Sequence, residues 1–224
     1  MVCTCTDIGI FIYLIKFNVS NLKIMKNAAA DWYLPLKSKY PLVSDEEWLL
    51  LNKFGKFKTI KKGHNFLSSG EIARYSAFVI SGHFAYTIVD DEGNEKIIKF
   101  GLINDFLANC QSFYNKTPSV MSITALEDSV VCRINIKQMQ PLYNIHMCIA
   151  DVNLAIYQEA AQQTFEHQYM LSFKSPLKRY KFLMEKRPEI IRKISIKNIA
   201  KYLYVSREAI SRARLSLKNN EGLL

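Results

Sequence analysis

The distribution of glycine divides this chain of 224 residues into two different parts. Six of the eight glycines lie between Gly55 and Gly101, and none occurs from Leu102 to Glu221. Glycines at this spacing are typical of tight turns between short strands, because glycine adopts positive φ at no steric cost. The distribution therefore predicts a β-rich unit followed by a helical unit, which is an α+β fold.

Short segments rich in β-branched and aromatic residues alternate with these glycines. The segment Asp90–Asn94 contains Gly93 and is typical of a hairpin loop. Many short strands joined by regular turns favour an antiparallel barrel, roll or sandwich. The predicted strands are Lys56–Ile60, Ser76–Ile80, Phe84–Val89, Lys96–Phe100, Ser122–Ala125 and Val130–Ile134.

A helical pattern follows, since neither glycine nor proline occurs between Pro141 and Pro176. A heptad repeat counted from Met147 predicts one helix of about 25 residues, roughly 40 Å long. Such a seam suits a partner helix in a homodimer, and packing against the chain's own β unit is the alternative. The two heptad rows are Met147, Leu154, Ala161 and Gln168, and Ala150, Tyr157, Thr164 and Leu171.

The C-terminal residues predict a helix-turn-helix. Ser175-Pro176 begins a helix that Pro188 ends. Ser195 can cap the next helix, whose apolar residues follow the helical period. A short turn at Tyr204-Val205 then leads to a helix that is capped by Ser206 and runs to about Leu217. The apolar residues of the Ser195-capped helix are Ile196, Ile199, Ala200 and Leu203.

The last of these helices has two contrasting faces. Ala209, Ile210, Ala213 and Leu217 form a narrow apolar arc that can seat the helix on the one before it. Arginine pairs with guanine and glutamate accepts from cytosine in the major groove, so the opposite face is suited to reading base edges. Ser195, Lys197 and Ser206 lie at helix starts and suit phosphate contacts. The expected base-reading residues are Arg207, Glu208, Ser211 and Arg212.

The charge of the chain supports a polyanionic partner for this segment. Residues 174–224 contain fourteen Lys and Arg against four Asp and Glu, a net of +10, which equals the net charge of the whole chain. Double-stranded DNA is therefore the expected partner of this segment alone. We find no P-loop, nucleophile elbow or HExxH motif, and we predict no enzymatic activity.

The five cysteines, at positions 3, 5, 110, 132 and 148, form no CxxC pair. Their odd number and scatter predict inert thiols without disulfides, no metal site, no cofactor and a cytoplasmic protein.

The apolar run Ile8–Ile15 is too short to span a membrane, and we expect no membrane partner. Residues 1–30 are treated as an N-terminal extension without an assigned function.

These features together resemble the Crp/Fnr-type transcription regulators, from about Trp48 to Lys218. Ser206-Arg207-Glu208, with Arg212 four residues after the glutamate, matches the recognition-helix pattern of that family. The stretches Pro176–Pro188 and Ile199–Leu203 are similar to Bacteroidetes-type members. The resemblance implies an antiparallel β-roll of the cyclic-nucleotide-binding type at 31–145, a dimerisation helix at 146–173 and a winged helix-turn-helix at 174–224. It also implies a palindromic DNA site, with RNA polymerase as a further candidate partner.

Two positions depart from the family pattern. Tyr204 stands where the family usually has glycine, which costs about 1–2 kcal/mol if the residue is left-handed. Ala108-Asn109 replaces the Gly-Glu pair that binds the ribose of cyclic AMP. Ser119-Val120-Met121 replaces the Arg-Ser-Ala that binds its phosphate, and a buried phosphate needs a paired cation or several donors. We therefore expect no binding of cyclic AMP in the usual mode.

The effector and the regulatory outcome stay open. Phe106, Asn109, Ser119 and Met121 are the candidate effector-pocket residues, and loss of ligand binding is the alternative. The sequence leaves the effector unidentified and does not distinguish an activator from a repressor. A sensor or scaffold module that binds a small molecule or protein, and not DNA, is the alternative function.

Overall fold

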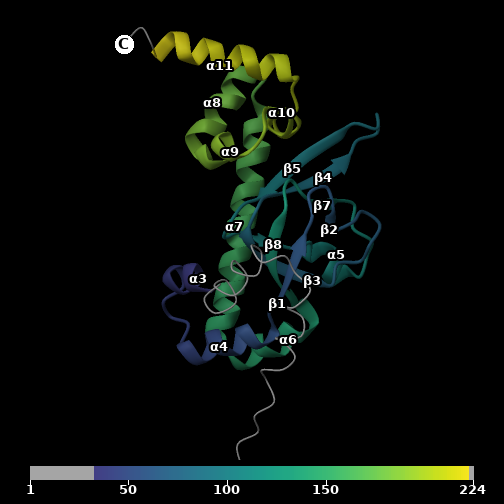
Figure 1. Ribbon diagram of the computed structural model, residues 1–224, viewed down its shortest axis with the longest axis vertical. Coiled ribbons are helices and arrows are strands. Elements are labelled where there is room, and N and C mark those ends of the chain that lie inside the picture. Colours follow the sequence, from purple (N-terminus) through teal and green to yellow (C-terminus); the bar gives the residue numbers. More distant parts are fainter. Residues whose placement is uncertain (1–32, 222–224) are drawn as a thin grey trace, which may run out of the picture.

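The computed structural model describes residues 33–221, and only the backbone beyond residue 217 (Figure 1). The expected N-terminal extension, with the run Ile8–Ile15 and two of the five cysteines, lies outside the described residues. The described chain begins with short helices and continues into a β unit. A long helix then runs along the β unit and ends at a group of C-terminal helices (Figure 1).

Two helices precede the first strand, α3 (Leu34–Lys39) and α4 (Asp45–Phe54). Ser44 caps α4, because its hydroxyl accepts from the Glu47 N–H at 3.3 Å and the Glu47 carboxylate accepts from the Ser44 N–H at 3.0 Å. Trp48 of α4 is among the most buried side chains of the described residues. Both helices lie beside the N-terminal half of the long helix (Figure 1).

The β unit consists of two four-stranded sheets with the orders β1-β8-β3-β6 and β2-β7-β4-β5, and all paired strands are antiparallel. The six predicted strands are confirmed. Strands β2 and β6 were not predicted, because they have three and two residues and are too short to show a period of two. The strands are β1 (Lys56–Ile60), β2 (Asn65–Leu67), β3 (Tyr75–Ser81), β4 (Phe84–Val89), β5 (Glu95–Gly101), β6 (Phe106–Leu107), β7 (Ser122–Ala125) and β8 (Ser129–Asn135).

The predicted hairpin joins β4 to β5. The Asp90 N–H donates to the Asn94 carbonyl at 3.0 Å, and the Asp90 carboxylate accepts from the Asn94 N–H at 2.7 Å. Gly93 has φ +81° at the turn, a conformation that disfavours side chains.

Alternate residues of β3 face two different cores. Ala77 and Val79 point between the two sheets, where they pack in a cluster with Phe84, Leu107 and other residues from both sheets. Phe78 points to the other side of its sheet and joins a cluster with residues of the flanking helices. The sheet β1-β8-β3-β6 is therefore covered on both faces, with the β-roll interior on one side and helices on the other.

Helix α7 (Met147–Ser172) has 26 residues and follows the shorter helices α5 (Cys110–Asn115) and α6 (Ile136–Ile145). The predicted heptad row that contains Met147 and Leu154 is exposed, with 72% and 55% of those two residues accessible. In the other predicted row, Tyr157 lines a cavity beside the β unit and Leu171 packs against the C-terminal helices, whereas Thr164 is exposed. Two large side chains of α7 outside both predicted rows, Phe165 and Tyr169, are also exposed.

Four helices follow, α8 (Pro176–Lys186), α9 (Pro188–Lys193), α10 (Ile196–Leu203) and α11 (Arg207–Glu221). Pro188 follows α8 as predicted, and it also occupies the first turn of α9. Helix α11 is four residues longer than the predicted end at Leu217. Between residues 174 and 221 the described chain contains no strand, so the expected strands of a wing are not among the described residues.

The C-terminal helices pack directly on the β4–β5 hairpin and the end of α7. The ring of Tyr202 lies 5.0 Å from that of Phe100 and is stacked on His167 at 4.2 Å, measured between ring centroids. The Lys201 ammonium forms an ion pair with Glu95 of β5 at 2.9 Å. The β unit, α7 and the C-terminal helices thus share one hydrophobic cluster.

Candidate nucleic-acid interface

Two serines fix the starts of α10 and α11. The Ser195 hydroxyl accepts from the Asn198 N–H at 3.4 Å, and the Ser206 hydroxyl accepts from the Ala209 N–H at 3.1 Å. Each serine satisfies one of the backbone donors that a helix leaves unpaired in its first turn. The predicted caps are therefore confirmed, and both serines are exposed.

The turn between α10 and α11 is left-handed at Tyr204, with φ 55° and ψ 48°. The N–H groups of Tyr204 and Val205 both donate to the Ala200 carbonyl, which closes the end of α10. This conformation normally favours glycine. Position 204, where this sequence has tyrosine and the family pattern has glycine, therefore does adopt the left-handed conformation. The Tyr204 ring has an edge-to-face contact with His167 at 5.7 Å.

The predicted apolar arc seats α11 on the helices beneath it. Ile210 and Ala213 are buried, and Ala209 and Leu217 are half-buried. In α10, Ile199, Ala200 and Leu203 are buried as predicted, whereas Ile196 is exposed. Ile196 is the first residue of α10.

The polar side chains predicted to read bases lie on the solvent-exposed side of α11. Arg207, Glu208, Ser211 and Arg212 are all exposed, as the sequence predicts. Arg214 is also exposed and was missed, although its spacing of seven residues from Arg207 places it on the same row of the helix. Among the described residues none of these arginines is in an ion pair, so their guanidinium groups are available to a partner.

The polar groups of this face differ in what they can offer. The Glu208 carboxyl bonds to its own backbone N–H and to Ser206, which holds its pKa below the usual value, so Glu208 is an anionic acceptor at neutral pH. The Ser211 hydroxyl donates to the Arg207 carbonyl at 3.1 Å, which leaves its lone pairs as acceptors. Lys197, a predicted phosphate contact, is exposed in the first turn of α10.

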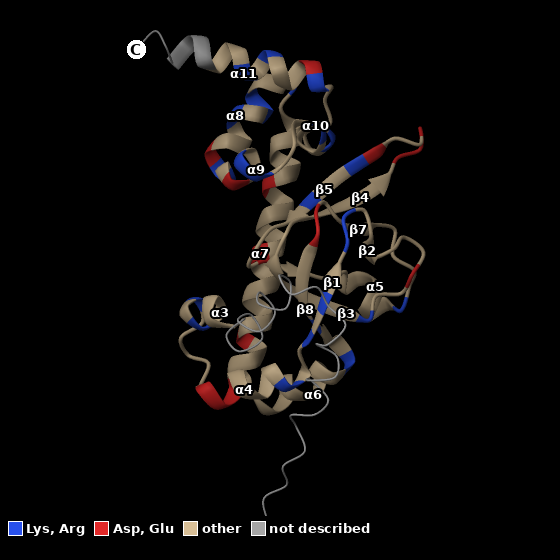
Figure 2. Cartoon of the chain, viewed as in Figure 1, with Lys and Arg blue, Asp and Glu red and all other residues tan. Residues whose placement is uncertain are grey.

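Other basic residues of residues 174–217 are engaged within the fold. The Arg187 guanidinium pairs with Glu166 of α7 at 2.9 Å, and Lys201 pairs with Glu95. The Arg179 guanidinium donates to three backbone carbonyls and is tied to the helix ends. Lys and Arg occur on all four C-terminal helices (Figure 2), and exposed ones without an ion pair to a described residue lie on each of them: Lys178 and Lys186 on α8, Arg192 and Lys193 on α9, Lys197 on α10, and Arg207, Arg212 and Arg214 on α11.

The candidate effector residues do not form one group. Asn109, Ser119 and Met121 are joined, because the Asn109 amide donates to the Ser119 hydroxyl at 2.8 Å and that hydroxyl donates to the Met121 carbonyl at 2.6 Å. The Asn109 carbonyl oxygen also accepts from the Ser112 N–H at 3.2 Å. Phe106 lies elsewhere, packed on Phe78 with ring centroids 5.3 Å apart on the helical side of the sheet.

Residues 57–146 match the family model of the cyclic nucleotide-binding domain. No curated protein matches the chain. None of the described helices combines the length and the apolar composition that a membrane span needs.

Solved structures share the fold. FixK2 from Bradyrhizobium japonicum is 20% identical, with a TM-score of 0.63 over 75% of this chain and 86% of its own. A CooA mutant from Carboxydothermus hydrogenoformans is 16% identical, with a TM-score of 0.62 over 79% and 81%. A cyclic nucleotide-binding domain containing protein from Listeria monocytogenes EGD-e is 18% identical, with a TM-score of 0.62 over 86% and 92%. These matches extend the likeness beyond the β unit to most of each chain.

Proposed function

We propose that this chain is a Crp/Fnr-type transcription regulator that binds a palindromic DNA site as a homodimer. The observation that carries the proposal is the exposed face of α11, where Arg207 and Arg212 flank an anionic Glu208 on a capped, firmly seated helix. Guanidinium groups can donate two parallel hydrogen bonds to guanine, and the carboxylate can accept from cytosine. No enzymatic activity is part of the proposal.

The proposal divides the chain into parts with separate roles. Residues 31–145 form the effector domain, 146–173 the dimerisation helix and 174–224 the DNA-binding domain. The exposed row of α7 with Met147, Leu154 and Phe165 supports self-association, because large apolar side chains at helical spacing favour a partner helix. A Bacteroidetes-type origin, a cytoplasmic location and contact with RNA polymerase belong to the same proposal.

Cyclic AMP is not the effector in this proposal. The hydrogen bonds among Asn109, Ser112, Ser119 and Met121 use the polar groups that would otherwise face a ligand in this part of the β unit. A cyclic phosphate would need a cation or several free donors there. Addition of cyclic AMP should therefore leave DNA binding unchanged.

Selection of bound DNA from a random-sequence pool tests the function. The purified protein should enrich a palindrome with G·C pairs in each half-site, and the half-site centres should lie about one helical turn apart, roughly 34–36 Å. Weak binding that is lost with added salt and shows no sequence enrichment would instead support a sensor or scaffold module.

Paired variants sharpen that selection. The double variant Arg207→Ala, Arg212→Ala should lose the enriched sequence. The control Lys178→Ala, Arg192→Ala removes the same charge from exposed positions on α8 and α9 and should retain it. Equal loss in both double variants would show that net charge, and not the face of α11, determines binding.

A further inference from the structure

Three cations lie close together on strands β1 and β8 of the β unit. Lys56 of β1 is the register partner of Arg133 of β8, and Lys58 follows two residues later on β1. Phe57 and Cys132, their neighbours in the two strands, pack with the flanking helices. Because successive side chains of a strand point to opposite faces, the three cations lie on the other face of the sheet. We call Lys56, Lys58 and Arg133 the β1–β8 basic face.

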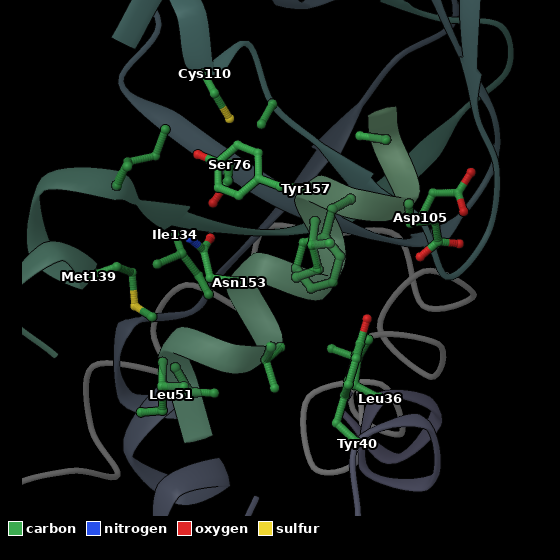
Figure 3. A pocket seen from close by; sticks show the side chains of 18 of the residues that line it. Leu36, Tyr40, Leu51, Ser76, Asp105, Cys110, Ile134, Met139, Asn153 and Tyr157 are labelled. Atoms are coloured by element: carbon green, nitrogen blue, oxygen red, sulfur yellow. The ribbon is translucent and has the colours of Figure 1, made fainter. Parts of the chain in front are cut away.

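The next strand places an aromatic ring on the same face. Figure 3 shows Ser76 of β3 and Ile134 of β8 on the helical side of the sheet, beside Tyr157 of α7. Tyr75 and Arg133 precede these two residues in their strands and therefore point to the opposite side. The Arg133 guanidinium lies over the Tyr75 ring, with Cζ 4.6 Å from the ring centroid, so the ring holds the guanidinium in place.

The donors of Arg133 differ in what they can reach. Its Nε is enclosed and has no hydrogen-bond partner, so Nε is not available to a ligand. Its two Nη groups also lack a partner among the described residues, but they are accessible from an open hollow that Arg133 and Tyr75 line. A guanidinium stacked flat on a ring keeps its outer N–H groups in one plane, the geometry that binds phosphate with two parallel hydrogen bonds.

No ion pair within the described part of the chain neutralises the β1–β8 basic face. Arg74 lines the same hollow as Arg133, is exposed, and is likewise without an ion pair. The acid in the wall of this hollow is Glu71, whose carboxylate accepts from the Ser68 N–H at 2.9 Å. The hollow and the neighbouring strands therefore have an excess of positive charge.

The arrangement has an unfavourable element. Like charges that are directly opposite in an antiparallel pair destabilise the sheet, and Lys56 is directly opposite Arg133. Strand β1 is at the edge of its sheet, where lysines discourage pairing with another chain. That reason applies to Lys56 and Lys58 but not to Arg133, because β8 is paired on both sides. An anion bound from outside would remove the repulsion between the two strands.

From the like-charge pair, the stacked guanidinium and the lack of a neutralising acid, we propose that the β1–β8 basic face binds a small molecule that carries two or more linked phosphates. Arg133 binds two oxygens of one phosphate, and the lysines of the neighbouring strand, about 5 Å away, bind the next. A lone carboxylate offers too few oxygens and too little charge for three cations.

This site goes beyond the proposed DNA-binding function and does not depend on it. Figure 1 shows β1 near α4 and α6, at the other end of the chain from α11. DNA bound to α11 therefore leaves the β1–β8 basic face free.

Isothermal titration calorimetry at low salt and without divalent cations tests the proposal. Because the arginines of α11 also attract polyanions, the full chain is used with Arg207→Ala and Arg212→Ala. Tripolyphosphate should bind at least about tenfold more tightly than inorganic phosphate, and than a short glutamate peptide of matched charge. No tripolyphosphate binding, or equal binding of the peptide, would overturn the proposal.

ATP in a parallel titration distinguishes two sources of linked phosphates. Tighter binding of ATP than of tripolyphosphate would support the proposed chemistry with a nucleoside triphosphate as the ligand. Equal or weaker binding of ATP would support it with the linked phosphates alone as the recognised group.

Variants in the same background locate the site. Arg133→Gln and Lys56→Gln should each weaken tripolyphosphate binding about tenfold or more, because each removes a charged donor. The control Lys62→Gln removes the same charge from an exposed residue beyond the end of β1 and should have little effect. Equal losses at Lys56 and Lys62 would show that binding follows net charge, and would overturn the assignment of the site.

Thermal unfolding gives a second readout that does not depend on the fold tolerating each change equally. Lys56→Gln removes the like-charge pair, so it should raise Tm in the absence of ligand. Saturating tripolyphosphate should raise Tm less in Lys56→Gln than in its parent, because the ligand binds it more weakly. An equal rise in both proteins would overturn the proposal. No DNA is present in these experiments, so their failure leaves the proposed function standing.

Discussion

The Arg179 guanidinium of α8 donates a hydrogen bond to the Leu203 carbonyl at the end of α10, with Nη1 and the oxygen 2.8 Å apart. The same group donates to the carbonyls of Leu171 and Phe173 at the end of α7, at 3.0 and 2.7 Å. Carbonyls at helix C-termini lack intrahelical partners and carry partial negative charge. Arg179 therefore joins the long helix to the helix that precedes α11.

Arg179→Ala should lower the free energy of unfolding by about 2–4 kcal/mol, because three carbonyls lose a charged donor. The stability of Arg179→Lys should lie between that of the unchanged protein and that of Arg179→Ala, because an ammonium cannot donate in the planar geometry of a guanidinium. Urea unfolding at fixed protein concentration measures both. Lys178→Ala, at an exposed neighbour, should change stability by no more than about 0.5 kcal/mol. A loss for Arg179→Ala no larger than for this control would remove Arg179 from the joint.

The left-handed turn at Tyr204 gives a prediction about two matched substitutions. Tyr204→Gly and Tyr204→Ala both lose the ring contacts with His167 and Lys96. Only alanine keeps a Cβ that is strained at φ 55°. The glycine variant should therefore be more stable than the alanine variant by about 1 kcal/mol, as measured by thermal unfolding. If Tyr204→Ala were as stable as Tyr204→Gly or more stable, a Cβ at position 204 would not be strained.

Patterns within one helix could be predicted from the sequence, whereas hydrogen bonds between distant helix ends could not. The caps at Ser195 and Ser206 and the arc around Ile210 follow from patterns within one helix, and they are confirmed. The role of Arg179 could not be predicted, because its three acceptor carbonyls lie at the ends of two other helices, up to 24 residues away in the sequence. Its charge adds to the basic total of the segment, yet its hydrogen bonds are structural.

The position of Phe106 and the covered side of α7 also depend on tertiary contacts that no local pattern contains. Phe106 is adjacent in sequence to Leu107, but the alternation of a strand sends the two to opposite sides of the sheet. For α7, heptad counting finds two apolar rows, and it cannot tell which one the β unit covers. Tyr157 lines a cavity whose wall is made of many separate segments of the chain, so it leaves no local pattern.

Arg212→Ala should reduce the discrimination between the selected DNA site and random DNA by about 1–3 kcal/mol. Lys197→Ala should weaken binding to both DNAs alike and reduce the salt slope by about one unit, as expected for a phosphate contact. Fluorescence anisotropy at several salt concentrations measures both effects. If Arg212→Ala weakened both DNAs equally, Arg212 would not read a base.

The exposed row of α7 should mediate self-association. Leu154→Glu places a charge in that row and should raise the dimer dissociation constant at least 10²-fold, because each interface contact occurs twice in a symmetric dimer. Thr164→Glu adds the same charge to an exposed position of α7 outside that row, and should have little effect. Sedimentation equilibrium measures the constant. A larger effect at Thr164 would place the dimer contact on the heptad row of Thr164 and not on that of Leu154.

His167 should make stability depend on pH. Its Nε2–H donates to the Tyr202 carbonyl at 2.9 Å, and burial, partly offset by that hydrogen bond, lowers the pKa of its imidazole. The unfolded chain, with a histidine pKa of about 6.5, then binds a proton more readily than the folded chain. The contribution of His167 is therefore fully present above about pH 6.5 and is lost as the pH falls below it. His167→Gln keeps a donor without titrating, so unfolding free energies measured from pH 8 to pH 5 should fall less steeply in this variant. Parallel curves for the two proteins would show that His167 does not titrate on unfolding.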